Sequence, residues 1–195
     1  MSAVMKIATP PEDLYAQLEA LPENLTGEII NGWLYTQARP TGRHGLAGSA
    51  LTMDIGSAYH RGRGGPGGWW ILDEPELHFI RDTEVLVPDL AGWRRERMPR
   101  LPNDHRFNVV PDWVCEIVSP STARKDRFTK MPVYARYGVS YLWLVDPVAR
   151  TLEAFALREE RWTVIGLFQD EAIVSVEPFA DIGLELGALW EPAAD

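Results

Sequence analysis

Apolar and polar residues follow two different periods along the chain, and these periods predict strands and helices. Apolar runs rich in β-branched and aromatic residues are typical of strands. They lie at 69–72, 76–80, 84–93, 111–119, 141–146, 151–157 and 161–168. Apolar residues at helical spacing lie at 14–20, 42–61, 121–139 and 184–190. The pattern therefore predicts a chain that mixes α and β structure.

Turn and breaker residues set the boundaries of these elements. Asn31-Gly32 lies between two β-rich runs, and this pair accepts the positive φ angles of a tight hairpin. The sequence Thr-Pro-Pro-Glu at 9–12 has the order of a helix start, with a capping residue, a proline and an acid. Pro132 lacks an N–H group, so we expect a kink or two helical pieces within 121–139.

Length and composition narrow the classes of protein. The 195 residues include 46% hydrophobic and 24% charged residues, which excludes a disordered or fibrous chain and predicts a single domain over 1–195. Neither a signal peptide nor an apolar run long enough for a membrane span is present, so we expect a cytoplasmic protein. Cys115 is the one cysteine; its apolar setting favours a small buried residue over a nucleophile.

The charge distribution qualifies the net charge of −9. Taken alone, this value argues against non-specific nucleic-acid binding, which depends on neutralising phosphates. Residues 39–136, however, carry 15 basic and 12 acidic side chains, a net of +3, whereas the two ends together carry 4 basic and 16 acidic side chains, a net of −12. The middle of the chain is therefore the place to look for a nucleic-acid site.

Three acids occupy positions where a carboxylate is costly. Asp89 follows Pro88 inside an apolar run, Glu116 interrupts the run WVCEIV, and Glu28 lies among β-branched residues. A buried carboxylate needs a partner, an open cleft or a metal ion. The alternative for each acid is an outward position on a half-exposed strand.

The combination of these acids with the sequence around them resembles a known family. Pro88-Asp89 followed by Glu116 resembles the PD-(D/E)XK nuclease signature, and more specific are PDWVCEIVSPST at 111–122, DRFTKMPVYARYGV at 126–139 and YLWLVDP at 141–147. With the hairpin at 27–32 and a later His44, these motifs resemble the Uma-two family of restriction-endonuclease-like proteins over about 10–190. The resemblance implies an α/β fold with a mixed central sheet, flanking helices and additional β-hairpins.

The resemblance also implies residue roles. Asp89 and Glu116 take the Mg²⁺ (or Mn²⁺) ligand positions, and Glu28 becomes a further ligand or a water-orienting group. One departure is Val118, which stands where the signature has lysine; Lys130 on the following helix matches the family pattern and is expected to supply the ammonium group instead. The alternative is a solvated lysine on a charged helix face. With these roles the chain would be a metal-dependent endonuclease that hydrolyses DNA phosphodiester bonds.

Basic residues near these acids are candidates for holding DNA, and ordinary solvated positions are the alternative for each. The first choices are Arg43, His44, Arg94, Arg95 and Arg124, with Arg39, Arg61, Arg63, Arg97, Arg100, Lys125 and Arg127 as further candidates. A homodimer is expected only by analogy, with 72–80 and the adjoining WWIL run as its face. Two other functions stay open: a non-catalytic nucleic-acid or protein-binding module with the nuclease fold, and, less well supported, a glycosidase-like hydrolase with a carboxylate pair.

Overall fold

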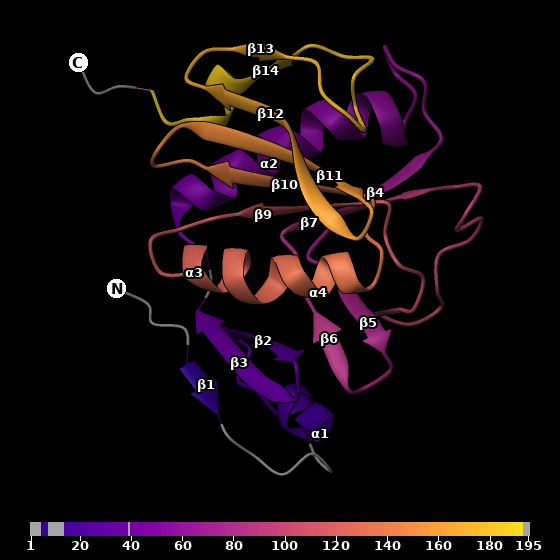
Figure 1. The fold of residues 1–195 in the computed structure, drawn as a ribbon, viewed down its shortest axis with the longest axis vertical. Helices are drawn as coiled ribbons and strands as arrows, with labels where there is room; N and C mark the ends of the chain where they lie inside the picture. The colour runs from indigo at the N-terminus through magenta and orange to yellow at the C-terminus, as the bar shows by residue number, and fades with distance from the viewer. Residues whose placement is uncertain (1–4, 8–13, 39, 193–195) are drawn as a thin grey trace.

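The computed structural model describes residues 5–7, 14–38 and 40–192, and it shows a mixed α/β fold built on two six-stranded sheets (Figure 1). The expected fold class is therefore confirmed. The helix start expected at 9–12 lies outside the described residues, as does Arg39. Within the described residues, no helix is long and apolar enough to span a membrane.

The first sheet has the strand order β1-β3-β2-β6-β5-β8. Its strands are β1 (Met5–Ile7), β2 (Leu25–Ile30), β3 (Trp33–Ala38), β5 (Glu76–Ile80), β6 (Glu84–Leu86) and β8 (Arg106–Phe107). The predicted hairpin joins β2 to β3, with φ of 53° at Asn31 and 74° at Gly32. The short helix α1 (Leu14–Glu19) packs Leu14 and Tyr15 against this sheet.

The second sheet has the order β12-β11-β10-β9-β7-β4. Its strands are β4 (Trp69–Asp73), β7 (Leu90–Arg94), β9 (Trp113–Ile117), β10 (Tyr141–Asp146), β11 (Thr151–Arg158) and β12 (Arg161–Gln169). Strands β9 and β10 are parallel and the other neighbours are antiparallel. All five residues of β9 are buried, as the uninterrupted apolar run predicts for a central strand.

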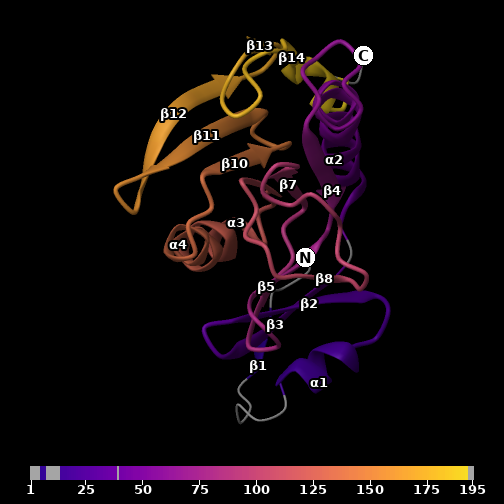
Figure 2. The same cartoon turned by 90° about the vertical axis from the view of Figure 1, so that its right-hand side faces the viewer.

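Helices cover both faces of the second sheet. Helix α2 (Gly42–Ile55) continues into the π-helical turn η2 (Gly56–His60) and packs on one face, with the C-terminal elements β13 (Ile173–Val174), β14 (Leu184–Glu185) and η4 (Leu186–Leu189) nearby. On the other face lies one continuous helical segment made of α3 (Ala123–Lys125), η3 (Asp126–Lys130) and α4 (Met131–Arg136). Figures 1 and 2 show this segment between the two sheets.

The predicted kink takes the form of a π-helical turn. Pro132 lies at the start of α4, and the N–H of Met131 bonds to the carbonyl of Asp126, five residues back. Such a turn adds a residue to the helix and commonly marks a functional region. The helix at 121–139 is therefore present, with its irregularity just before the proline.

One expectation for the middle of the chain was wrong. The run at 84–93 is two strands, not one, because the chain leaves the first sheet after β6 and enters the second at β7, and Pro88 in the connection has no N–H for a ladder. After β7, the stretch at 95–111 is mainly loop and contains the short strand β8, which pairs with β5.

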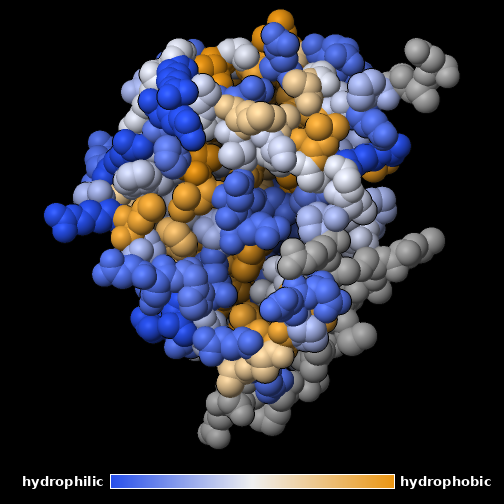
Figure 3. Space-filling view, turned by 180° about the vertical axis from the view of Figure 1, so that it is seen from behind, coloured by the Kyte–Doolittle hydropathy of each residue, from blue (hydrophilic) through white to orange (hydrophobic). Residues whose placement is uncertain are grey.

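The expected dimer face is mostly interior. Trp69 and Ile71 are buried in the core, and Leu77 and His78 are also buried, while Ile80 is exposed. Seen from behind, the surface is largely hydrophilic, and the apolar side chains visible there form separate patches (Figure 3). The WWIL run therefore supplies core packing, because its large side chains stabilise the protein most when removed from water.

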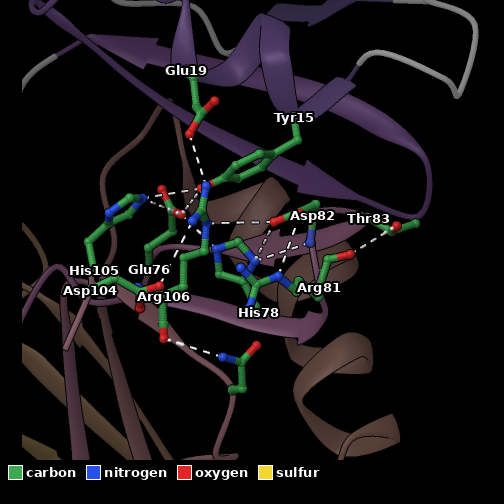
Figure 4. A network of polar contacts seen from close by, with 11 residues as sticks. Tyr15, Glu19, Glu76, His78, Arg81, Asp82, Thr83, Asp104, His105 and Arg106 are labelled. Carbon is green, nitrogen blue, oxygen red and sulfur yellow. Dashed lines mark hydrogen bonds and ion pairs between the residues drawn. The ribbon is translucent and has the colours of Figure 1, made fainter. Parts of the chain in front are cut away.

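A polar network ties α1 to the edge of the first sheet (Figure 4). The Tyr15 hydroxyl donates to Glu76 Oε1 at 2.8 Å and accepts from Arg106 Nε at 2.9 Å. His78 Nδ1 accepts the N–H of Asp82, so its Nε2 carries the proton and donates to Glu76 at 2.6 Å. This network lies outside the cluster of predicted catalytic residues and holds the N-terminal helix in place.

Candidate active site

Lys130 lies buried at the junction of the two sheets and bridges two of the predicted acids. Its Nζ is 2.7 Å from Glu116 Oε1 and 2.8 Å from Glu28 Oε1, and it donates to the carbonyl of Val87 at 3.1 Å. The side chain is 1% exposed, so the alternative of a solvated lysine on the helix surface is excluded. The π-helical turn directs this residue inward between β9 and β2.

Glu28 is held by a second lysine. Lys125 Nζ lies 2.6 Å from Glu28 Oε2 and also donates to Gln37 Oε1 at 2.6 Å, while the N–H of Val87 donates to Glu28 Oε1 at 2.9 Å. Both oxygens of Glu28 therefore have donors. Burial would raise the pKa of Glu28, but the ammonium groups of Lys125 and Lys130 overcome this effect and hold the pKa at about 2.

Asp89 lies at the bend where the chain enters β7, beside Glu116 on the neighbouring strand β9. The N–H of Ile117 donates to Asp89 Oδ2 at 2.6 Å, and His44 Nε2 lies 2.8 Å from Oδ1. Although burial lowers the pKa of His44, the contact with Asp89 raises it above the ordinary value. His44, on helix α2, therefore contacts Asp89, the aspartate of the PD-(D/E)XK signature.

Glu116 is buried beside one ammonium group and several other carboxylates. It accepts the Tyr134 hydroxyl and the Lys130 ammonium through Oε1. Burial nevertheless raises the pKa of Glu116 well above its ordinary value; Lys130 opposes this rise, and the charges of Asp126 and Asp89 add to it. The contacts with Tyr134 and Lys130 are both made to Oε1, and the second oxygen, Oε2, takes part in neither. The carboxylate therefore retains an oxygen that can bind a cation.

The charges of the buried cluster do not balance within the chain. Four carboxylates lie against two ammonium groups: Glu28, Asp89, Glu116 and Asp126 against Lys125 and Lys130. If all four carboxylates were ionised, one negative charge would remain in excess even with a protonated imidazole at His44, which agrees with the raised pKa values of Glu116 and Asp126. A divalent cation would offset this excess.

Asp89 and Glu116 provide carboxylate oxygens of the kind that Mg²⁺ binds. Carboxylate oxygens are the ligands that Mg²⁺ prefers, and one or two carboxylates with water commonly suffice. Across the described ranges, no three His, Cys, Asp or Glu side chains are placed to surround one ion. Ammonium groups contact both oxygens of Glu28, predicted as a third ligand, but only one oxygen of Glu116, and the contacts of Asp89 are with an imidazole and a backbone N–H. Asp89 and Glu116 are therefore the residues that would hold a metal.

A groove opens beside this cluster. It has a volume of about 1390 Å³ and is lined by the start of α2 at 41–46, the loop at 118–121, the outer face of α3 and η3, and 147–148. His44 and Lys125, which contact Asp89 and Glu28, both line the groove. His44 and Lys125 therefore connect the buried cluster to the groove.

The structure separates the predicted nucleic-acid residues into two groups. Arg43, His44 and Arg124 line the groove, with Arg43 also 2.7 Å from Glu191. Arg94 and Arg95 line a different hollow of about 440 Å³. There the guanidinium group of Arg95 lies 4.1 Å from the centre of the Trp70 ring and donates to backbone carbonyls, so packing accounts for it.

Other basic candidates also have structural partners. Arg97 pairs with Asp112 at 2.9 Å, and Arg127 pairs with Glu153. Lys125, expected to face DNA, is 7% exposed and reaches inward to Glu28. Tyr134 and Gln37 were missed entirely. The helical spacing of Asp126, Lys130 and Tyr134, at four-residue intervals, is the signal that could have placed all three on the inner face of the helix.

Comparisons with known proteins found a matching family and a solved structure of similar fold. The family described as "Uma2: Putative restriction endonuclease" matches residues 12–188. A crystal structure from Anabaena variabilis, described as a putative nuclease belonging to DUF820, is 24% identical, with a TM-score of 0.72 over 90% of this chain and 96% of that chain. No curated protein matches the chain significantly. The structural likeness shows that the two chains share a fold.

Proposed function

The chain belongs to the Uma2 family, and from this premise we propose that it is a divalent-metal-dependent endonuclease that hydrolyses DNA phosphodiester bonds. The observation that carries the proposal is a buried cluster of Asp89, Glu116 and Lys130 behind His44, which contacts Asp89 and lines a groove that also presents Arg43 and Arg124. Paired acids beside an ammonium group are the side chains that metal-assisted phosphodiester hydrolysis needs.

Mg²⁺ or Mn²⁺ held by Asp89 and Glu116 would lower the pKa of a bound water and offset charge on the scissile phosphate. The chain itself orients both ligands. The N–H of Ile117 and the imidazole of His44 fix the two oxygens of Asp89, and Lys130 with Tyr134 fixes Oε1 of Glu116. Held in this way, the carboxylates need little rearrangement to bind a cation.

The two lysines have different roles in the proposal. Lys130 has three N–H groups and three acceptors, namely Val87, Glu28 and Glu116, so it acts as a positioning residue for the acids. Lys125 uses two N–H groups, on Glu28 and Gln37, and it lines the groove. Its third N–H is the one we assign to the phosphate, where it would stabilise charge in the transition state.

The experiment that tests the proposal is plasmid cleavage. Supercoiled DNA is incubated with the protein and Mg²⁺ or Mn²⁺, using wild type, Asp89→Asn and Glu116→Gln. The matched control is Glu185→Gln, an exposed acid on β14. We expect nicking by wild type and the control, and none by either site variant or with EDTA. Cleavage that survives both site variants would overturn the proposal.

A second function has one observation in its favour. The lysines satisfy Glu28 completely and Glu116 in part, so the cluster also suits an ionic core in a binding module without catalysis. Calorimetry with Mg²⁺ and Mn²⁺ separates the two functions. Binding of either ion that is lost in Asp89→Asn supports the nuclease, and no binding together with no cleavage supports the binding module.

A further inference from the structure

Phe128 is an aromatic residue that the fold leaves in solvent. It lies in η3, two positions from both Asp126 and Lys130, which point inward, and it is 76% exposed. It lines the groove and also, with Arg124 and Arg127, a smaller adjoining hollow of about 570 Å³. Other apolar side chains of the chain are also exposed, but Phe128 lies on the groove, where its ring can stack against a ligand with a flat apolar face.

The rest of the groove also combines apolar side chains with cations. Exposed apolar side chains at Leu46 and Val148 line it together with two cations, Arg124 and Arg43, of which Arg43 is paired with Glu191 at 2.7 Å in the same lining. Nucleic acids offer this combination of apolar base faces and phosphate charge, but a duplex keeps its base faces stacked inside. Only unpaired nucleotides present them to a protein.

The acids lie deeper than the groove lining. The side chains of Glu28 and Glu116 are 1% and 4% exposed, and that of Asp89 is 16% exposed. A flexible single strand can bend toward a recessed centre more readily than a stiff duplex can. The net charge of −9 also favours a single strand as the ligand. Binding of a rigid duplex depends on many phosphate contacts, and the groove supplies few cations for them.

We propose that the groove binds single-stranded DNA, with an unpaired base stacked on Phe128 and the adjoining phosphates beside Arg43 and Arg124. This inference rests on the proposed nuclease function and names its substrate class. Stacking on Phe128 would set the position of the strand, and the backbone would then pass His44 and Lys125 at the entrance to the acids.

Binding is measured by fluorescence anisotropy without turnover, in EDTA and separately in Ca²⁺. The probes are a labelled single-stranded oligonucleotide of roughly 20 nucleotides, which exceeds the usual site size, and the same sequence as a duplex. We expect the single strand to bind at least about tenfold more tightly than the duplex. Equal or tighter binding of the duplex would overturn the inference.

Substitutions at position 128 separate stacking from general apolar contact. Phe128→Leu keeps an apolar side chain without a ring, and Phe128→Tyr keeps the ring. We expect Phe128→Leu and Phe128→Ala to weaken single-strand binding roughly 5- to 150-fold, and Phe128→Tyr to stay within about twofold of wild type. Leu167→Ala, which changes an exposed apolar residue on β12, is the control and should bind as wild type does.

Wild-type affinity in Phe128→Leu would overturn the stacking assignment. Because Phe128 is exposed, its variants should fold, and their melting temperatures check this. The outcomes also distinguish the two proposals. Duplex preference combined with Asp89-dependent cleavage contradicts only the single-strand inference, whereas Phe128-dependent single-strand binding without metal-dependent cleavage contradicts the nuclease proposal.

Discussion

Lys130 and Glu116 form an ion pair inside the protein, with Nζ 2.7 Å from Oε1 and side chains that are 1% and 4% exposed. The pair joins the helical segment to the central strand β9. A buried charge that loses its partner costs far more than a surface charge, because water cannot replace the partner. The stability of the fold is therefore coupled to the same residues that we assign to the proposed chemistry.

Replacing Lys130 tests this coupling. In Lys130→Met, both Glu28 and Glu116 lose a cation at a buried position, and we expect the free energy of unfolding to fall by about 3–5 kcal/mol. Urea denaturation measures this change. Arg136→Met is the control on the same helical segment, since Arg136 is 53% exposed and its surface contacts contribute at most about 1 kcal/mol. Equal losses in the two variants would contradict the coupling.

Metal binding should raise thermal stability. A ligand that binds only the folded protein stabilises it by about 2.7 kcal/mol at a hundredfold excess over Kd, so Mg²⁺ or Mn²⁺ should increase the Tm of wild type. Asp89→Asn should lose this increase, and Glu185→Gln should keep it. Differential scanning fluorimetry checks the result without any nuclease assay. An identical increase in Asp89→Asn would place the metal elsewhere.

Lys125 should affect the rate more than binding. If its third N–H contacts the phosphate, Lys125→Met should lower kcat by about 10²–10³-fold, as loss of a donor to transition-state charge does. The metal-dependent rise in Tm should persist. The neighbouring Arg124→Met should change mainly KM, because Arg124 is exposed on the groove and lies among the residues assigned to substrate binding. Unchanged kcat in Lys125→Met would remove it from the mechanism.

Two buried tyrosines predict a loss of stability in alkali. Burial, together with the nearby carboxylates of Glu76 and Asp181, raises the pKa of Tyr15 and of Tyr59 to about 12. The folded protein then holds protons that the unfolded chain releases above about pH 10, so each group's contribution to stability is present below pH 10 and is lost between pH 10 and 12.

Both groups should therefore steepen the fall in stability over that interval. Denaturation at several alkaline pH values measures the slope, and near-ultraviolet absorbance follows phenol ionisation. Tyr15→Phe should have a shallower slope than wild type, because phenylalanine has no proton to release. A slope unchanged in Tyr15→Phe would contradict the role of Tyr15.

Local patterns allowed most elements to be predicted. The Asn31-Gly32 turn, the buried strand β9 and the helix interrupted near Pro132 each depend on neighbouring residues, whose preferences can be read from the chain. The split of 84–93 into β6 and β7 could not be predicted, because both strands are apolar and only tertiary pairing places them in different sheets.

The candidate site, too, could be predicted from the sequence only in part. Asp89 and Glu116 were found because an acid inside an apolar strand is conspicuous. The sequence did not show that two neighbouring basic residues point in different directions. Arg124 faces solvent, whereas Lys125 points inward and places its Nζ 2.6 Å from Glu28 Oε2. Helical spacing predicts which face of the helix each residue lies on. It does not predict that Lys125 pairs with Glu28, because Glu28 lies on β2 of the other sheet, which the helix contacts only in the folded protein.

The π-helical turn η3 makes the site sensitive to chain length as well as to residue type. Because Met131 bonds to Asp126, five residues back, this turn contains one residue more than an α-helical turn would. Deleting a residue between Asp126 and Lys130 would remove the extra residue and give this turn regular α-helical winding. The turn would then have one position fewer to divide between the inner face, which carries Asp126 and Lys130, and the outer face, which carries Phe128. A single deletion would therefore alter the buried cluster and the groove lining together, whereas a substitution changes only one side chain.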